Sequence, residues 1–291
     1  MRVTDLYSNK APVLSMEFFP PRDAAAAEKF DGIVDKLAKR NPDYMTVTFG
    51  AGGSNRDGSY QTVQKLVKEK QLPSVAYIAG YGLGPEEIAE VLDNYKALGV
   101  ETIFVIRGDQ PRDEGFVPHP DSFSYASELI DFIKGRYDFT LGCAGYPEGH
   151  LEAESLDKDI ACLKKKQDNG AAYVVAQYCY DNRFFFDYVE KCRAAGVSVP
   201  IIPGIMPVYT VKLTNILAGV CGATITPQLQ DKLDAVADAD KETVLQTGID
   251  FAVDQCRDLL RQGVPGLHFY TMNRSKSTGE IIDRLKGENL L

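Results

Sequence analysis

The sequence predicts an α/β fold in which eight parallel strands close into a (β/α)8 barrel. The first observation is that short apolar, β-branched or aromatic runs alternate with helix-length segments almost to the end of the chain. Such alternation is typical of parallel strands joined by right-handed crossovers. The second is size, because eight strand–helix units in 291 residues fit a barrel of about 250 residues. A doubly wound sheet with a similar strand count is the alternative.

The expected strands are short and regularly spaced. They are 14–19, 44–49, 74–79, 102–106, 140–146, 173–178, 200–205 and 267–271. Helices are expected between them, including 24–40, 85–98 and 157–169, with two or three extra helices in 209–262 before the last strand. Pro85 opens a helix and Gly99, Gly170 and Gly196 follow helix ends, where these residue types are favoured. No linker divides the chain, so we expect one domain, 1–291.

The first strand carries a carboxylate among apolar residues. In LSMEFFPPR, 14–22, Glu17 lies close to the carboxyl end of the strand, because Pro20 and Pro21 cannot donate to a sheet ladder and end it. A buried carboxylate without a partner is energetically costly. One explanation is structural pairing with Arg22 or Arg107. The other, more frequent for carboxylates at strand ends, is membership of a functional site.

Polar residues recur at the carboxyl ends of nearly all expected strands, where a barrel builds its active site. They are Glu17, Thr48, Tyr77, Arg107 to Asp109, Tyr146 to His150, Gln177 with Asp181, and Tyr270 with Arg274. The sequence therefore predicts one site that includes Glu17. The loop GAGGS, 50–54, does not fit the established nucleotide-binding patterns. The run 164–166 of three lysines is typical of a solvated helix face, with anion binding as the alternative.

Composition narrows the class of protein. With a net charge of −9, the chain is not expected to bind nucleic acid or an anionic membrane. Its six cysteines are dispersed, which disfavours a disulfide framework and a zinc site and fits a reducing cytoplasm. The three histidines lack metal-ligand spacing, so no metal is expected. No segment reaches membrane-spanning length, and we expect a cytoplasmic protein without membrane insertion.

Eight motifs together resemble one family. In chain order they are MEFFPP, VTFGAGGS, IRGD, YASEL, YPEGH, AQYCYD, IIPGIMPV and GLHFYTMNR. In order and spacing they are similar to the 5,10-methylenetetrahydrofolate reductases, from Glu17 to Arg274. The resemblance implies a (β/α)8 barrel that binds a flavin, normally FAD, at its carboxyl face. It also implies NAD(P)H as electron donor and a place in one-carbon metabolism and methionine biosynthesis.

The resemblance implies a hydride relay and assigns roles to individual residues. Reduced flavin passes hydride to the methylene carbon of the folate and gives 5-methyltetrahydrofolate. Glu17 matches the general acid that protonates the departing folate nitrogen, and Asp109 matches the second catalytic residue, which faces flavin and pterin. Gln177, Tyr270 and Arg274 match substrate-side positions. The cofactor-binding positions are Thr48, Tyr77, Arg107, Gly108, Asp109, Tyr125, Ala126, Tyr146, His150, Asp159, Lys165 and Lys166.

Departures from the family pattern concentrate on the cofactor and nicotinamide side. Tyr77 stands where a histidine is usual, Cys162 where an asparagine is usual and Lys165 where an arginine is usual. Ala176 and Leu213 replace a threonine and a glutamine. These changes keep three alternatives open: FMN in place of FAD, a folate-binding subunit that receives electrons from a partner protein, and a pterin-binding methyltransferase. We expect the compact, catalytic-only form, as a homo-oligomer or in a complex with an electron-supplying subunit.

Overall fold

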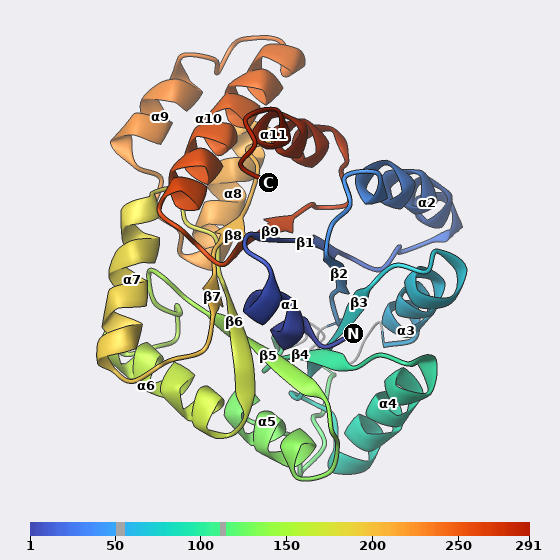
Figure 1. Ribbon diagram of the computed structural model, residues 1–291. Helices are drawn as coiled ribbons and strands as arrows, with labels where there is room; N and C mark the ends of the chain where they lie inside the picture. The colour runs from blue at the N-terminus through green and yellow to red at the C-terminus, as the bar shows by residue number, and fades with distance from the viewer. Residues whose placement is uncertain (51–55, 111–114) are drawn as a thin grey trace.

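The computed structural model describes residues 1–50, 56–110 and 115–291, so only Gly50 of the GAGGS loop lies within the described residues. All strand pairs form one parallel sheet in the order β7-β6-β5-β4-β3-β2-β1-β9-β8, with helices around it (Figure 1). The strands are β1 Val13–Phe18, β2 Tyr44–Val47, β3 Ser74–Ala79, β4 Thr102–Ile106, β5 Thr140–Gly145, β6 Ala171–Ala176, β7 Ile201–Ile202, β8 Gly204–Ile205 and β9 Gly266–Tyr270.

Pro203 divides the expected seventh strand into two pieces that close the barrel. β7 pairs with β6 through Ile201 and Val174, whereas β8 pairs with β9 through Gly204 and His268. Proline has no N–H to donate, but the Pro203 carbonyl still accepts from the His268 amide at 3.1 Å. One short segment therefore joins both edges of the sheet. The barrel prediction is confirmed, and the doubly wound alternative, which leaves two open edges, is wrong.

Helices follow the strands and cover the outside of the barrel. They are α1 Val3–Asn9, α2 Ala24–Ala38, α3 Arg56–Gln64 with a π-helical continuation Lys65–Glu69, α4 Pro85–Leu98, α5 Ala126–Lys134, α6 Leu156–Asp168, α7 Asn182–Ala194, α8 Val211–Cys221, α9 Pro227–Asp234, α10 Lys241–Arg261 and α11 Lys276–Gly287. The extra helices expected before the last strand are α8, α9 and α10. Gly99 follows α4 in the left-handed conformation, with φ +85°, which glycine adopts without strain.

The first helix was not expected, and it lies across the amino-terminal end of the barrel (Figure 1). The Val3 amide donates to Thr102 Oγ1 at 3.2 Å, and the Tyr7 and Tyr44 hydroxyls are 2.9 Å apart. Thr102 and Tyr44 are the first residues of β4 and β2. The helix therefore covers the barrel end opposite the strand ends where polar residues gather.

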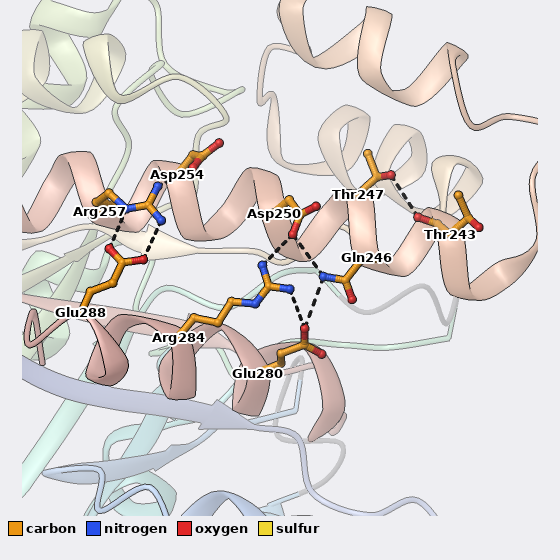
Figure 2. Close-up of polar contacts among 9 residues, drawn as sticks. All are labelled: Thr243, Gln246, Thr247, Asp250, Asp254, Arg257, Glu280, Arg284 and Glu288. Carbon is orange, nitrogen blue, oxygen red and sulfur yellow. Dashed lines mark hydrogen bonds and ion pairs between the residues drawn. The ribbon is translucent and has the colours of Figure 1, made fainter.

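The last two long helices are joined by a network of ion pairs, which Figure 2 shows. Arg284 of α11 contacts Asp250 of α10 at 2.6 Å and Glu280 at 2.8 Å. Arg257 of α10 binds both carboxylate oxygens of Glu288 at 2.7 Å. A single exposed ion pair contributes little to stability, but a bidentate contact between an arginine and a carboxylate fixes the relative orientation of the two side chains. They hold α11 in place just after the 271–275 segment at the site end of β9.

The contact between α10 and the chain after β8 gives a stability prediction. A Cβ at Gly248 would lie 2.3 Å from the Val208 carbonyl oxygen and 2.8 Å from its Cβ. Because the obstacle includes backbone, we expect Gly248→Ala to cost about 1–3 kcal/mol. Gly219→Ala, in α8 with nothing within 4 Å, is the matched control and should stabilise by up to about 1 kcal/mol. Thermal unfolding of both variants checks this, and equal midpoints would contradict the packing described.

Candidate active site

A cavity of about 460 Å³ opens at the carboxyl ends of β4 and β5, against α6. Its walls combine apolar, aromatic and charged groups. The residues expected from the sequence that line it are Arg107, Tyr125, Ala126, Tyr146, His150, Asp159, Lys165 and Lys166. The others include Ile106, Ser127, Ala144, Glu152, Glu154, Lys158 and Cys162. The structure thus brings together most of the residues predicted to bind a cofactor.

One face of α6 supplies the charged wall. Cys162 follows Asp159 by three residues, and Lys165 and Lys166 follow Cys162 by three and four, so the four residues lie on one side of the helix, and all line the cavity. The Lys166 ammonium donates to the Ala144 carbonyl at 3.0 Å and lies 5.7 Å from the centre of the Tyr146 ring. Among the described residues, no carboxylate is within ion-pair distance of Lys165. This wall can therefore bind an anion.

Arg107, Asp159 and His150 make specific contacts in the cavity. Arg107, just after β4, forms an ion pair with Glu152. Burial raises the pKa of the Asp159 carboxyl, while Lys166 and His150 act in the opposite direction. His150 meets the Tyr146 ring edge to face, with centroids 4.7 Å apart. An aromatic surface with cations at one end suits a planar ligand that carries phosphate.

Glu17 lies inside the barrel near the end of β1 and is only 6% exposed. The Tyr77 hydroxyl donates to Glu17 Oε2 at 2.5 Å. His268 Nε2 is 3.6 Å from the same oxygen, beyond hydrogen-bond distance. No described arginine lies within ion-pair distance of Glu17, and Arg107 pairs with Glu152 instead. The alternative interpretation, in which Glu17 forms a structural ion pair with Arg22 or Arg107, is therefore wrong.

Sequence reasoning missed two residues beneath Glu17. His268 is fully buried, and its Nδ1 lies 2.8 Å from Ser15 Oγ. Within the described part of the chain, His268 Nε2 has no hydrogen-bond partner. Ser15 and His268 stand two residues before Glu17 and Tyr270, so all four side chains face the barrel interior. This period of two was the signal that could have identified them.

The substrate-side residues are spread around the barrel mouth. Tyr270 is opposite Glu17 in the β1–β9 register, and its hydroxyl donates to the Ala176 carbonyl at 3.4 Å. Gln177 borders a small recess between Tyr146 and Cys221. Asp109 is exposed after β4. Arg274 is also exposed, with its guanidinium 4.9 Å from the centre of the Tyr209 ring.

Some residues expected at the cofactor do not line the cavity within the described residues. Tyr77 faces Glu17, and the Thr48 amide donates to the Phe18 carbonyl at 3.0 Å. Gly108 has φ +86°, and a Cβ there would lie 2.8 Å from Ala79 Cβ, so glycine is required for this turn. Leu213 packs in the apolar cluster around α8 and α9. Cys162, by contrast, lines the cavity.

Two negative findings apply to the described ranges. No cluster of three or more His, Cys, Asp or Glu side chains there could hold a metal ion. None of the helices found there has the length and apolar character needed to cross a membrane.

Fold and site together define a class of protein. It is a (β/α)8 barrel with a small-molecule cavity and a buried carboxylate at the carboxyl ends of its strands. The family model described as methylenetetrahydrofolate reductase matches residues 2–286. The chain belongs to the methylenetetrahydrofolate reductase family, as the sequence motifs predicted.

Relatives from bacteria, fungi and plants carry the same name. The 5,10-methylenetetrahydrofolate reductase of Escherichia coli is 32% identical over 272 residues, covering 94% of this chain and 90% of that protein. Methylenetetrahydrofolate reductase 1 of Schizosaccharomyces pombe is 34% identical, covering 93% and 45%. Methylenetetrahydrofolate reductase (NADH) 1 of Arabidopsis thaliana is 34% identical, covering 93% and 48%. The chain spans about half the length of the yeast and plant relatives.

Solved structures with low sequence identity share the fold. An uncharacterized protein from Clostridium thermocellum, which binds two copies of 5-methyl-5,6,7,8-tetrahydrofolic acid, aligns with a TM-score of 0.65 at 14% identity over 98% of both chains. A 2,3-dimethylmalate lyase aligns with a TM-score of 0.56 at 10% identity, covering 99% of this chain and 85% of that one. At these identities the likeness concerns the fold alone.

Proposed function

We propose that this chain reduces 5,10-methylenetetrahydrofolate to 5-methyltetrahydrofolate with a bound flavin. The observation that carries the proposal is the buried Glu17 carboxyl at the carboxyl end of β1, the same end of the barrel at which a cavity lined by aromatic and cationic groups opens. Membership of the reductase family supports the reaction class. The NADH named for the Arabidopsis relative supports a nicotinamide electron donor.

The cavity fits a flavin in size and chemistry. Its volume of about 460 Å³ is within the usual range of ligand sites, about 300–1,000 Å³. Lys165 and Lys166 would bind phosphate oxygens, and Tyr146, Tyr125 and His150 would contact the rest of the molecule. When bound, the flavin supplies the hydride for the folate methylene carbon. We propose FAD as the flavin, as the resemblance to the family implies, with FMN as the alternative.

Glu17 is the proton donor in this proposal. Opening of the folate five-membered ring leaves negative charge on the departing nitrogen, which a carboxylic acid held nearby would neutralise by protonation. The Glu17 side chain is 6% exposed and lies in the barrel interior, where the Tyr77 hydroxyl donates to its Oε2 at 2.5 Å. His268 and Ser15 support the same region from below.

The other substrate-side residues bind and orient the folate. Asp109 would accept N–H donors of the pterin, and Gln177 would contribute an amide at the barrel mouth. Tyr270 would form one wall next to Glu17. Arg274 would pair with the glutamyl carboxylate, because guanidinium and carboxylate form paired hydrogen bonds. Thr48 and Gly108 would shape the loops beside the flavin. We also propose a cytoplasmic location, which the six free thiols support.

The test is the absorbance spectrum of the purified protein under anaerobic conditions, with the flavin released by heat and identified. We expect FAD that bleaches when NADH or NADPH is added. Bound flavin that neither nicotinamide reduces would assign the electron supply to a partner protein. Protein that cannot be loaded with FAD or FMN would contradict the flavin and favour the pterin-binding methyltransferase.

A further inference from the structure

We propose that Tyr77 positions the proton donor: its hydroxyl holds Glu17 Oε2 and leaves Oε1 to carry the proton to the folate. Tyr77 is buried, with 6% exposure, and lies outside the cavity that we assign to the flavin. Its hydroxyl is 2.5 Å from Glu17 Oε2. Because Glu17 is the proton donor only under the proposed function, this role of Tyr77 depends on that function.

The Tyr77 ring is held rigidly from behind. It stacks on Phe104 with centroids 4.4 Å apart and planes 22° apart, and Phe104 packs against Tyr173 at 6.0 Å. The three residues come from the neighbouring strands β3 and β4 and from β6. A ring fixed in this way directs its hydroxyl to one place, so the hydrogen bond selects one orientation of the Glu17 carboxyl group.

Two neighbours converge on the same carboxyl oxygen. Tyr77 donates to Oε2, and His268 Nε2 lies 3.6 Å from Oε2. The described residues give Oε1 no hydrogen-bond partner. On the neighbouring strands, Glu17 is in register with Thr46 of β2 and with Tyr270 of β9. Thr46 carries no charge. Among the described residues, the titratable groups that face Glu17 are therefore Tyr77, His268 and Tyr270.

Tyr77 is a donor and not a second acid. Burial, followed by the charge of Glu17, raises the pKa of the Tyr77 hydroxyl well above 10. It therefore keeps its proton throughout the neutral range. A phenol O–H that points at a carboxylate stabilises the negative charge, which is the state Glu17 reaches after giving up its proton.

Tyr77 assists the transfer of a proton from Glu17 to the departing folate nitrogen. The Oε1–H bond of Glu17 breaks and an N–H bond forms on the departing folate nitrogen. The bond between that nitrogen and the methylene carbon breaks, and its electron pair stays with the nitrogen. The other folate nitrogen donates its lone pair to the methylene carbon, giving the iminium. The negative charge left on Glu17 is then shared through Oε2 with the Tyr77 hydroxyl.

Tyr77→Phe tests this role because it keeps the stacked ring and removes only the hydroxyl. We expect flavin content and flavin reduction by NADH equal to the wild type. We expect the rate at which methylenetetrahydrofolate reoxidises the reduced flavin to fall about 10- to 100-fold, as for the loss of one donor to a developing charge. The pH profile of that rate should also change, because the variant lacks the hydroxyl that contacts the proton donor.

Tyr95→Phe is the matched control. Tyr95 is a fully buried tyrosine of α4 whose hydroxyl has no hydrogen-bond partner among the described residues. Its variant should keep the wild-type rate and pH profile. Tyr77→Phe in a Glu17→Gln background should have no further effect on the rate, because without a carboxylic proton at position 17 the Tyr77 hydroxyl has no proton transfer to assist.

A second readout does not depend on turnover. The ¹³C signal of the Glu17 carboxyl, assigned by its absence in Glu17→Gln, should change its chemical shift in Tyr77→Phe and not in Tyr95→Phe, because only the first variant removes the hydrogen bond to Oε2. An unchanged signal and an unchanged rate would overturn the proposal. Loss of flavin from Tyr77→Phe would also overturn it and place Tyr77 at the cofactor. If the wild type fails to reduce folate, the proposed function falls, whereas the ¹³C signal still decides whether Tyr77 holds the Glu17 carboxyl group.

Discussion

Glu17→Gln is expected to slow folate reduction by about 10²- to 10⁴-fold, the usual contribution of a general acid. Glutamine keeps the size of the side chain and can still accept from Tyr77, but it has no carboxylic proton to give. Flavin binding and flavin reduction by NADH should remain, because Glu17 does not line the cavity assigned to the flavin. Separate anaerobic measurements of the two half-reactions check this expectation.

The matched control for this variant is Glu190→Gln. Glu190 is exposed on α7 and loses the same charge without touching the barrel interior. Its rates should equal those of the wild type. Two results would contradict the role of Glu17: a folate half-reaction that survives in Glu17→Gln, or a protein that no longer retains flavin.

Lys165→Gln and Lys166→Gln should each weaken flavin binding about 10- to 100-fold, as expected for a charge-assisted bond to phosphate. Both residues line the cavity. Fluorescence titration of the flavin-free protein with FAD and with FMN measures the effect. The loss should shrink as salt is added to the wild type and the variants, because salt screens the contribution of each lysine.

Lys164→Gln provides the control within the same run of three lysines. The Lys164 ammonium pairs with Asp168 one turn further along α6 and does not line the cavity. Its removal should leave flavin affinity unchanged. An equal loss of flavin affinity in all three variants would mean that only the overall surface charge matters. Unchanged affinity in all three would mean that the flavin phosphates bind elsewhere.

Much of the fold could be predicted because local signals agree with the tertiary structure. Strands 74–79 and 102–106 and helix 85–98 have the predicted limits, set by apolar runs and by Pro85 and Gly99. The helix α1 was not predicted, because Val3, Leu6 and Tyr7 give only one turn of apolar spacing, and the contacts that fix the helix are with Thr102 and Tyr44, far along the chain. The sequence predicted a single strand 200–205, and its division at Pro203 became visible only through the two separate pairings that close the sheet.

The candidate site, like the fold, could be predicted from the sequence only in part. Strand ends and motifs identified Glu17 and the lysines, but three consecutive helical residues point in directions about 100° apart. Which lysines face the cavity therefore depends on the rotation of α6 against the barrel, and the structure selects Lys165 and Lys166. His268 and Ser15 read as ordinary strand residues until the β1–β9 register placed them together.

The most direct test of the central claim is a single-turnover reaction without oxygen. The protein, with its flavin reduced by one equivalent of NADH, is mixed with 5,10-methylenetetrahydrofolate, and the flavin spectrum and the folate product are followed together. We expect the oxidised flavin spectrum to return while an equal amount of 5-methyltetrahydrofolate forms. Flavin that stays reduced, with the folate recovered unchanged, would contradict the assignment of this barrel as a methylenetetrahydrofolate reductase.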